Sequence, residues 1–215
     1  FAETKRSVDL IPLKNVSSKS KDVEKLSRDI ELIRYYLTFG SFPWWFEYPD
    51  KQIMIDLISN MVQHQPKTIS KVIRSVGQHA YSRGLMVKVL DEALRKSIVN
   101  LIEPVDGEFI SDYVSEVKSM NNKENLIKTQ SQDLTSTIWE FILEYLLVDR
   151  GSEFNRKVFL ESNVRRLANQ FNLRYQDLLI FLVQSIGTRH AASTKYISLF
   201  QTLHALYEET EDKAA

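Results

Sequence analysis

The sequence predicts an all-α fold, a multi-helix domain built from two related helical units by internal duplication. Apolar residues recur at helical spacing along most of the 215 residues, and no strand-like alternation is sustained. Two short landmarks also recur in the same order. Gly40-Ser41 matches Gly151-Ser152 at an offset of 111 positions. Ser75-Val76-Gly77 matches Ser185-Ile186-Gly187 at an offset of 110, and the one-residue difference falls in a loop region, where an insertion costs little.

The first unit is expected over residues 23–120, after a flexible arm at residues 1–22 that shows no clear period. Gly40 and Gly77 end the first and third helices, because glycine commonly terminates a helix. Pro66 falls in a first helical turn, where its missing N–H is tolerated. The expected apolar faces of the five helices span Leu26–Leu37, Ile53–Val62, Ile69–Val76, Leu85–Leu101 and Ile110–Val117.

The second unit is expected over residues 130–208, after a linker at residues 121–129 that follows Met120. Gly151 and Gly187 are predicted to end its first and third helices. The acidic tail at residues 209–215 is expected to fray. The expected apolar faces of its four helices span Leu134–Leu146, Leu160–Phe171, Leu178–Ile186 and Tyr196–Tyr207.

Composition limits the classes of function that the chain can have. Lysine plus arginine equals aspartate plus glutamate, 28 each, so the net charge offers no electrostatic reason to bind nucleic acid or an anionic membrane. The absence of cysteine excludes disulfides and thiolate metal sites, and it fits a cytoplasmic protein. No apolar run approaches the roughly 20 residues of a membrane span, so membrane insertion is not expected. Because the first residue is Phe1, we expect a piece of a longer chain.

No catalytic, cofactor-binding or metal site is predicted. The chain has neither a GxSxG elbow nor the glycine-rich loops that bind phosphates and dinucleotides. Carboxylates such as Asp91 and Glu92 are placed on solvent-facing sides of helices. The histidines form no i, i+4 pair, so we expect helix-end histidines rather than ligands and a chain that is not an enzyme. They are His64, His79, His190 and His204.

The turn after the first helix is the candidate contact site, because it is far more aromatic than ordinary helix linkers. In one interpretation its aromatic side chains fold back and close the core, which is worth roughly 1.5–3 kcal/mol for each buried side chain. In another, one tryptophan stays exposed and anchors a partner, since tryptophan is enriched at interface hot spots. A ligand pocket is the third. The later turn lacks the tryptophans, so the two copies have diverged here. The candidate residues of both turns are Gly40, Phe42, Pro43, Trp44, Trp45, Gly151 and Phe154.

The two turns resemble motifs of a known family. The run Leu37–Trp45, LTFGSFPWW, resembles the LxTGxLPWW turn of the tape measure proteins of contractile injection systems, which are phage-tail-like machines of bacteria. The run Trp139–Asn155 is similar to a second stretch of that family with an RGSxFN core. The departures, Phe39 before the glycine and Phe42 where the family favours leucine, keep an apolar character. The likeness covers roughly residues 30–187.

The resemblance implies a non-enzymatic role in setting the length of the particle during assembly. Its implied partners are the inner tube, the baseplate hub and the terminal cap. A compact domain of this size has a radius of gyration of about 17 Å, whereas a single continuous helix would reach about 320 Å. The predicted helix breaks favour the compact form, so we expect an anchoring domain rather than the ruler itself. The alternative is a generic α-helical repeat adaptor that binds a protein partner in a groove between its units.

Overall fold

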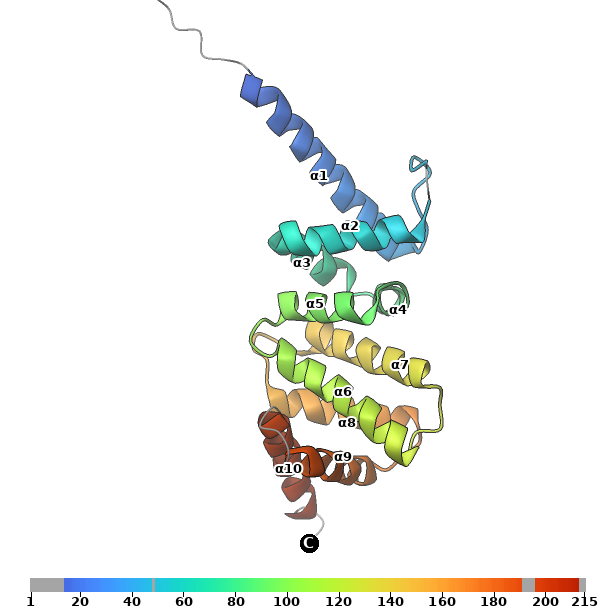
Figure 1. Cartoon of the computed structure of the whole chain (residues 1–215), viewed down its shortest axis with the longest axis vertical. Coiled ribbons are helices and arrows are strands. Elements are labelled where there is room, and N and C mark those ends of the chain that lie inside the picture. The colour runs from blue at the N-terminus through green and yellow to red at the C-terminus, as the bar shows by residue number, and fades with distance from the viewer. Residues whose placement is uncertain (1–13, 48, 191–195, 213–215) are drawn as a thin grey trace, which may run out of the picture.

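The structure is a computed structural model that describes residues 14–47, 49–190 and 196–212. Those residues contain helices and no strands, which confirms the all-α fold class (Figure 1). The helices stack along one long axis, with α1 at one end and α9 and α10 at the other. In chain order the elements are α1 (Lys14–Phe39), α2 (Lys51–His64), α3 (Pro66–Val76), α4 (Ala80–Val89), α5 (Glu92–Ile102), α6 (Gly107–Glu124), α7 (Ser131–Glu144), the π-helical turn η1 (Tyr145–Asp149), α8 (Arg156–Gln170), α9 (Tyr175–His190) and α10 (Ile197–Asp212).

Side-chain caps set the starts of three helices. Asp50 accepts a hydrogen bond from the backbone N–H of Gln52 in α2, and Asp91 accepts one from Leu94 in α5, at 2.9 and 2.7 Å. Asn155 does the same for α8. Each cap satisfies an N–H that has no partner inside its helix. Pro66 is the first residue of α3, as predicted.

One continuous hydrophobic core runs through both predicted units. The helix α7 packs against α4 and α6, which precede it in the chain, as well as against α8. Its Trp139 is fully buried. The helix α6 also contacts α9 and α10. The two units are therefore not separated in space by a boundary between independent cores.

The observed helices of the first half differ from the prediction in two places. The helix α1 begins at Lys14, before the predicted start at Val23, and residues 1–13 of the expected arm lie outside the described residues. The single helix predicted from Leu85 to Leu101 is wrong. The chain breaks at Leu90, where the backbone is extended, and Asp91 caps a new helix. The break escaped prediction because the apolar pattern continues through it.

The second half also departs from the predicted bounds. The helix α6 continues to Glu124 and ends at Asn125 in the left-handed conformation, so the connection to α7 is shorter than the predicted linker. The helix α9 passes through Gly187 instead of ending there. The helix α10 continues to Asp212, into the segment expected to fray. The predicted start of the last helix near Ala192 lies outside the described residues.

The internal duplication stays a prediction. Gly40 follows α1 and Gly151 follows η1, and both glycines have positive φ, of 72° and 67°. Each is followed by two helices, α2 and α3 in one case and α8 and α9 in the other. The other landmark behaves differently in the two halves, because Gly77 ends α3 whereas Gly187 lies within α9.

Candidate functional site: an aromatic turn and a neighbouring groove

The aromatic turn begins at Gly40, whose left-handed backbone ends α1. Its N–H donates to the carbonyl of Tyr36 at 2.8 Å. A side chain at this position would meet the hydroxyl of Tyr81, which comes from α4. That hydroxyl also lies 3.4 Å from the carbonyl oxygen of Phe39. Both the backbone conformation and the close approach of α4 therefore require glycine here.

Most of the aromatic rings in the turn fold back toward the core. Phe42 packs against Tyr36 with ring centroids 4.9 Å apart and stacks on Phe46 at 5.2 Å. Trp45 meets Phe46 edge-on at 6.4 Å. The N–H of Phe46 donates to the carbonyl of Pro43 at 3.0 Å, which closes the turn around the buried proline. These contacts agree with the core-closing interpretation for this part of the turn.

Trp44 lies in the opposite environment, with 94% of its surface exposed. Phe39 and Tyr81 are each 60% exposed, which is unusual for large aromatic residues. We call these three exposed side chains the aromatic surface: the Tyr81 hydroxyl meets the Phe39 carbonyl oxygen, and Trp44 follows five residues later in the same turn. The arrangement has the form expected of a partner anchor, a rigid turn carrying an exposed tryptophan. Its role in contact stays a prediction.

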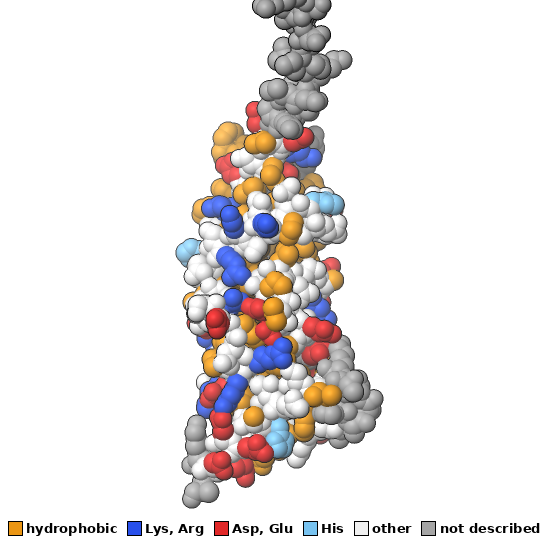
Figure 2. Space-filling view, turned by 90° about the vertical axis from the view of Figure 1, so that its left-hand side faces the viewer, with side chains coloured by type: hydrophobic (Ala, Val, Ile, Leu, Met, Phe, Trp, Pro, Cys, Tyr) orange, Lys and Arg blue, Asp and Glu red, His pale blue; other side chains and the backbone are white. Residues whose placement is uncertain are grey.

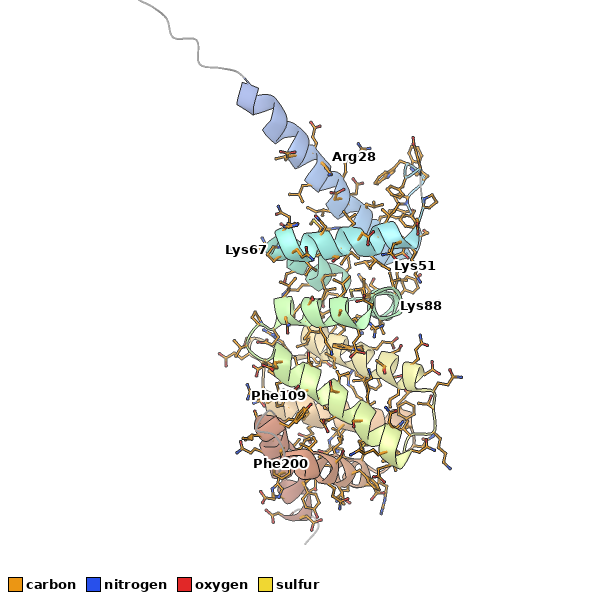
Figure 3. All side chains as sticks on the ribbon, viewed as in Figure 1. Arg28, Lys51, Lys67, Lys88, Phe109 and Phe200 are labelled. Carbon is orange, nitrogen blue, oxygen red and sulfur yellow. The ribbon has the colours of Figure 1, made fainter. Side chains whose placement is uncertain are left out.

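A groove of about 390 Å³ separates the turn from α1. Leu32, Trp45 and Phe46 provide its apolar part. Arg28, labelled on α1 in Figure 3, and Asp29 line its charged side. Burial raises the pKa of the Asp29 carboxyl, and nearby Lys25 and Arg28 oppose that effect.

The second glycine turn is exposed at Gly151, Ser152 and Glu153, but the residues around it are tied to the rest of the fold. Arg150, beside Gly151, pairs with Glu103, and Arg156 pairs with Asp106 at 2.5 Å. Both carboxylates belong to the connection between α5 and α6. Phe154 packs against Tyr145 and Phe159 in a cluster of rings, with centroid distances of 5.9 and 5.3 Å. These contacts give Arg150, Arg156 and Phe154 a structural role, and a partner contact at Gly151 or Phe154 stays a prediction.

The π-helical turn η1 belongs to the second predicted unit and packs against the first. The side-chain amide of Gln78 donates to the carbonyl of Leu147 at 2.6 Å. A side chain at Gly77 would collide with Leu147, so the glycine permits the close packing of η1 on the end of α3. The buried Arg83 donates to the carbonyls of Gly77 and Gln78 and lies 3.6 Å from Glu144. Sequence reasoning missed these residues, because their partners are distant in the chain.

A second groove, of about 490 Å³, lies between α4, α5 and α7. It adjoins the aromatic surface, because Tyr81 belongs to both. Sequence reasoning missed this groove. The available signal was the run Leu57–Leu90, which contains five lysines and arginines and no acidic residue. The lining residues are Tyr81, Gly84, Leu85, Val87, Lys88, Arg95, Gln132, Ser136 and Glu140.

Charge is unevenly placed on the surface. On the face shown in Figure 2, Lys and Arg side chains follow the middle of the molecule, and Asp and Glu gather at its lower end. The last turns of α10, which lies toward that end of the molecule in Figure 1, carry Glu208, Glu209, Glu211 and Asp212. The neutral total therefore conceals local basic and acidic regions.

No metal-ligand cluster of His, Cys, Asp or Glu occurs among the described residues. His64 is exposed at the end of α2, His79 is exposed in the connection between α3 and α4, and His204 lies 3.3 Å from Glu208 within α10. His190 has a side chain outside the described set. None of the described helices is long and apolar enough to cross a membrane.

These features define a class: a helical domain with an exposed aromatic surface and a groove, the form of a protein-interaction module. A family model described as "Contractile injection system tape measure protein" matches residues 10–214, so the chain belongs to that family. The family is structural rather than enzymatic, and its members are part of a particle assembled in the cell. No curated protein and no solved structure matches the chain.

Proposed function

We propose that this domain anchors a tape measure protein to another component of the contractile particle during assembly. The aromatic turn makes the contact, with Trp44 as the central side chain. The exposure of Trp44 carries this proposal: the tryptophan is 94% exposed on a turn whose rings at Phe42, Trp45 and Phe46 pack against the core. Holding such a large apolar side chain in water is unfavourable unless a partner covers it.

The folded shape supports anchoring rather than measuring. A ruler contributes contour length, and a continuous α-helix gains about 1.5 Å per residue. Here the helices turn back on one another in a packed stack, and they share one core. Length along the particle would then come from other segments or from an unfolded state of this domain.

The partners that fit this role are the inner tube, the baseplate hub and the terminal cap. This role places the domain in the cytoplasm, where the particle would be assembled. The candidate contact residues remain Gly40, Phe42, Pro43, Trp44 and Trp45 of the first turn, together with Gly151 and Phe154 of the second. Gly40 and Pro43 shape the first turn, and Trp44 presents its surface.

A generic adaptor is the second candidate function, and the groove between α4 and α7 is the observation that favours it. An adaptor would bind a peptide or helix without acting in particle assembly. Particle morphology separates the two, because only the assembly role makes the particle depend on this domain.

The test compares particles from three producing strains by electron microscopy: unaltered, Trp44→Ala, and a deletion of residues 14–212. We expect the deletion to abolish or derail assembly, and Trp44→Ala to reduce particle yield without changing particle length. Intact particles shortened by about 1.5 Å per deleted residue would show that the domain is part of the ruler. Unchanged particles would reject the assembly role and favour the adaptor function.

A further inference from the structure

We propose that the groove between α4 and α7 is a second binding site that receives an acidic helix of a partner subunit. This inference rests on the proposed function, because it names the chemistry of the partner. The volume of about 490 Å³ is in the range of sites that enclose several side chains. The walls are formed by Tyr81, Leu85 and Lys88 of α4 and by Gln132, Ser136 and Glu140 of α7.

Gly84 is the first observation in favour of an occupant. It lies in the middle of α4, where glycine is less favourable than alanine by roughly 1 kcal/mol. The fold itself does not need glycine there. A Cβ atom at Gly84 would meet only a carboxylate oxygen of Glu140 at 3.5 Å, which is an ordinary van der Waals contact. The space above Gly84 therefore suits the close approach of another backbone.

The charges of the groove select the occupant. Lys88 is exposed and forms no ion pair within the described residues. Arg95 donates to the carbonyl of Leu90 at 2.8 Å, and its acidic neighbours are Asp91 and Glu92. Glu92 is already engaged by Lys118 at 2.8 Å and by Lys96 at 3.2 Å. Two cations in the groove are thus available to carboxylates from a partner.

Glu140 is the acidic group that lines the groove. Partial burial raises the pKa of its carboxyl, and Arg83 opposes that effect. The oxygens of this partly buried carboxyl can accept hydrogen bonds, so an occupant with a hydrogen-bond donor at this point is favoured. A polyanion with phosphates throughout is disfavoured here, whereas a peptide presents both carboxylates and donors.

The spacing of the walls favours a helix. Tyr81, Leu85 and Lys88 lie at i, i+4 and i+7 on α4, and Gln132, Ser136 and Glu140 lie at i, i+4 and i+8 on α7. Each set forms one face of its helix. A helix laid between two such faces places its apolar side chains against Tyr81 and Leu85 and its carboxylates near Lys88 and Arg95. The small side chains at Gly84 and Ser136 provide room for it.

The groove and the aromatic surface are continuous. The Tyr81 hydroxyl contacts the carbonyl oxygen of Phe39, and Leu85 lies 3.8 Å from a Cβ position at Gly40. Figure 1 shows the turn and α4 on the same side of the stack. A partner in the groove can therefore also contact the Tyr81 end of the aromatic surface.

The experiment measures stability and binding on the whole 215-residue chain. The variants are Gly84→Ala, Lys88→Glu and Trp44→Ala, with Lys67→Glu as the control. Lys67 is an exposed lysine of the same acid-free run, and it lies on the opposite side of the molecule from Lys88 (Figure 3). The probes are the purified inner-tube, baseplate-hub and terminal-cap subunits of the same particle, tested by biolayer interferometry at two salt concentrations.

We expect Gly84→Ala to raise the melting temperature by about 2–4 °C, because alanine favours the helix. The same variant should weaken binding to one subunit by about tenfold or more. Lys88→Glu should weaken that binding by a similar factor and reduce its salt dependence. Lys67→Glu should leave it unchanged. If Gly84→Ala stabilises the fold but weakens binding, the glycine serves the contact with the partner rather than the stability of the chain.

Several results would overturn the groove proposal. A fall in melting temperature for Gly84→Ala would mean that the fold needs the glycine. Unchanged affinity for Gly84→Ala and Lys88→Glu, with Trp44→Ala still weakened, would reject the groove and leave the aromatic anchor standing. Equal competition by a nucleic acid duplex would assign the groove to polyanions. If no subunit binds and yet deleting the domain prevents assembly, the groove proposal fails and the proposed function stands.

Discussion

Adjacent residues in the aromatic turn have opposite environments. Trp45 is partly buried and meets Phe46, whereas Trp44 is almost fully exposed. The sequence identified the turn and its glycine, because a glycine stop and a Pro-Trp-Trp run are local signals. It left open which tryptophan is exposed, because neighbouring turn residues have no fixed side as they do on a helix or strand.

The two tryptophans should differ in their effect on stability. Trp45→Ala should lower the free energy of unfolding by about 2–3 kcal/mol, less than the 3–5 kcal/mol expected for a fully buried aromatic residue. Trp44→Ala should change it by no more than about 0.5 kcal/mol, since an exposed side chain away from other contacts contributes little. Chemical denaturation of the two variants checks this, with Trp139→Ala as the fully buried control. Equal losses at positions 44 and 45 would contradict the assigned environments.

The second turn shows a different limit of sequence reasoning. The acidic partners of Arg150 and Arg156 lie 47 and 50 residues earlier in the chain. Periodicity locates helices but does not pair side chains across such distances. The sequence therefore presents this turn as a candidate contact like the aromatic turn, although its arginines fasten it to the connection between α5 and α6.

At the scale of helices, the fold class and most of the apolar faces were predictable, and several boundaries were not. The break between α4 and α5 depends on one cap at Asp91, while Val87, Leu90 and Leu94 keep the helical spacing across it. The cap therefore sets this helix boundary, although the hydrophobic pattern alone predicts one continuous helix. The continuation of α9 through Gly187 is the reverse case, since packing against α10 and α8 holds a helix through a residue that usually ends one.

The joint between α5 and α6 should depend on pH through Glu92. The hydrogen bond from Lys118 holds the pKa of the Glu92 carboxyl below its ordinary range, against an opposing effect of burial. A carboxyl whose pKa is lower in the folded state adds stability above its unfolded-state pKa and loses it as pH falls through the folded-state pKa. Glu92→Gln should therefore destabilise the protein at pH 7 by about 0.5 kcal/mol, as for other partly exposed pairs. The difference should be smaller at about pH 3, which lies below the ordinary pKa of glutamate.

Denaturation of both proteins at the two pH values measures this difference. Lys96→Met serves as a comparison, because Lys96 contributes a weaker hydrogen bond to the same carboxyl. A Glu92→Gln effect that persists undiminished at low pH would mean that the side chain acts through packing rather than through its charge.

For the molecule as a whole, the sequence predicts two helical units, whereas the structure has one hydrophobic core to which both units contribute. The helix α7 belongs to the second predicted unit, yet it packs on α4 and α6 of the first. Gln78 and Arg83 also bind η1 and Glu144 across the expected boundary. The landmarks that suggested a duplication describe local chain geometry, and they carry no information about how closely two copies pack together.

The continuous core predicts one cooperative unfolding transition. Residues 14–124 alone would expose the faces of α4 and α6 that α7 covers, and residues 126–212 alone would expose the face of α7 that packs on α4 and α6. Each fragment loses apolar burial worth many times the few kcal/mol of a typical net stability. Far-ultraviolet circular dichroism, which follows all helices, and tryptophan fluorescence should give coincident denaturation midpoints for the whole chain. The separate fragments should show no cooperative transition. Two resolved transitions, or a fragment that unfolds cooperatively with a denaturant dependence fitting its size, would show that the two units are independent domains.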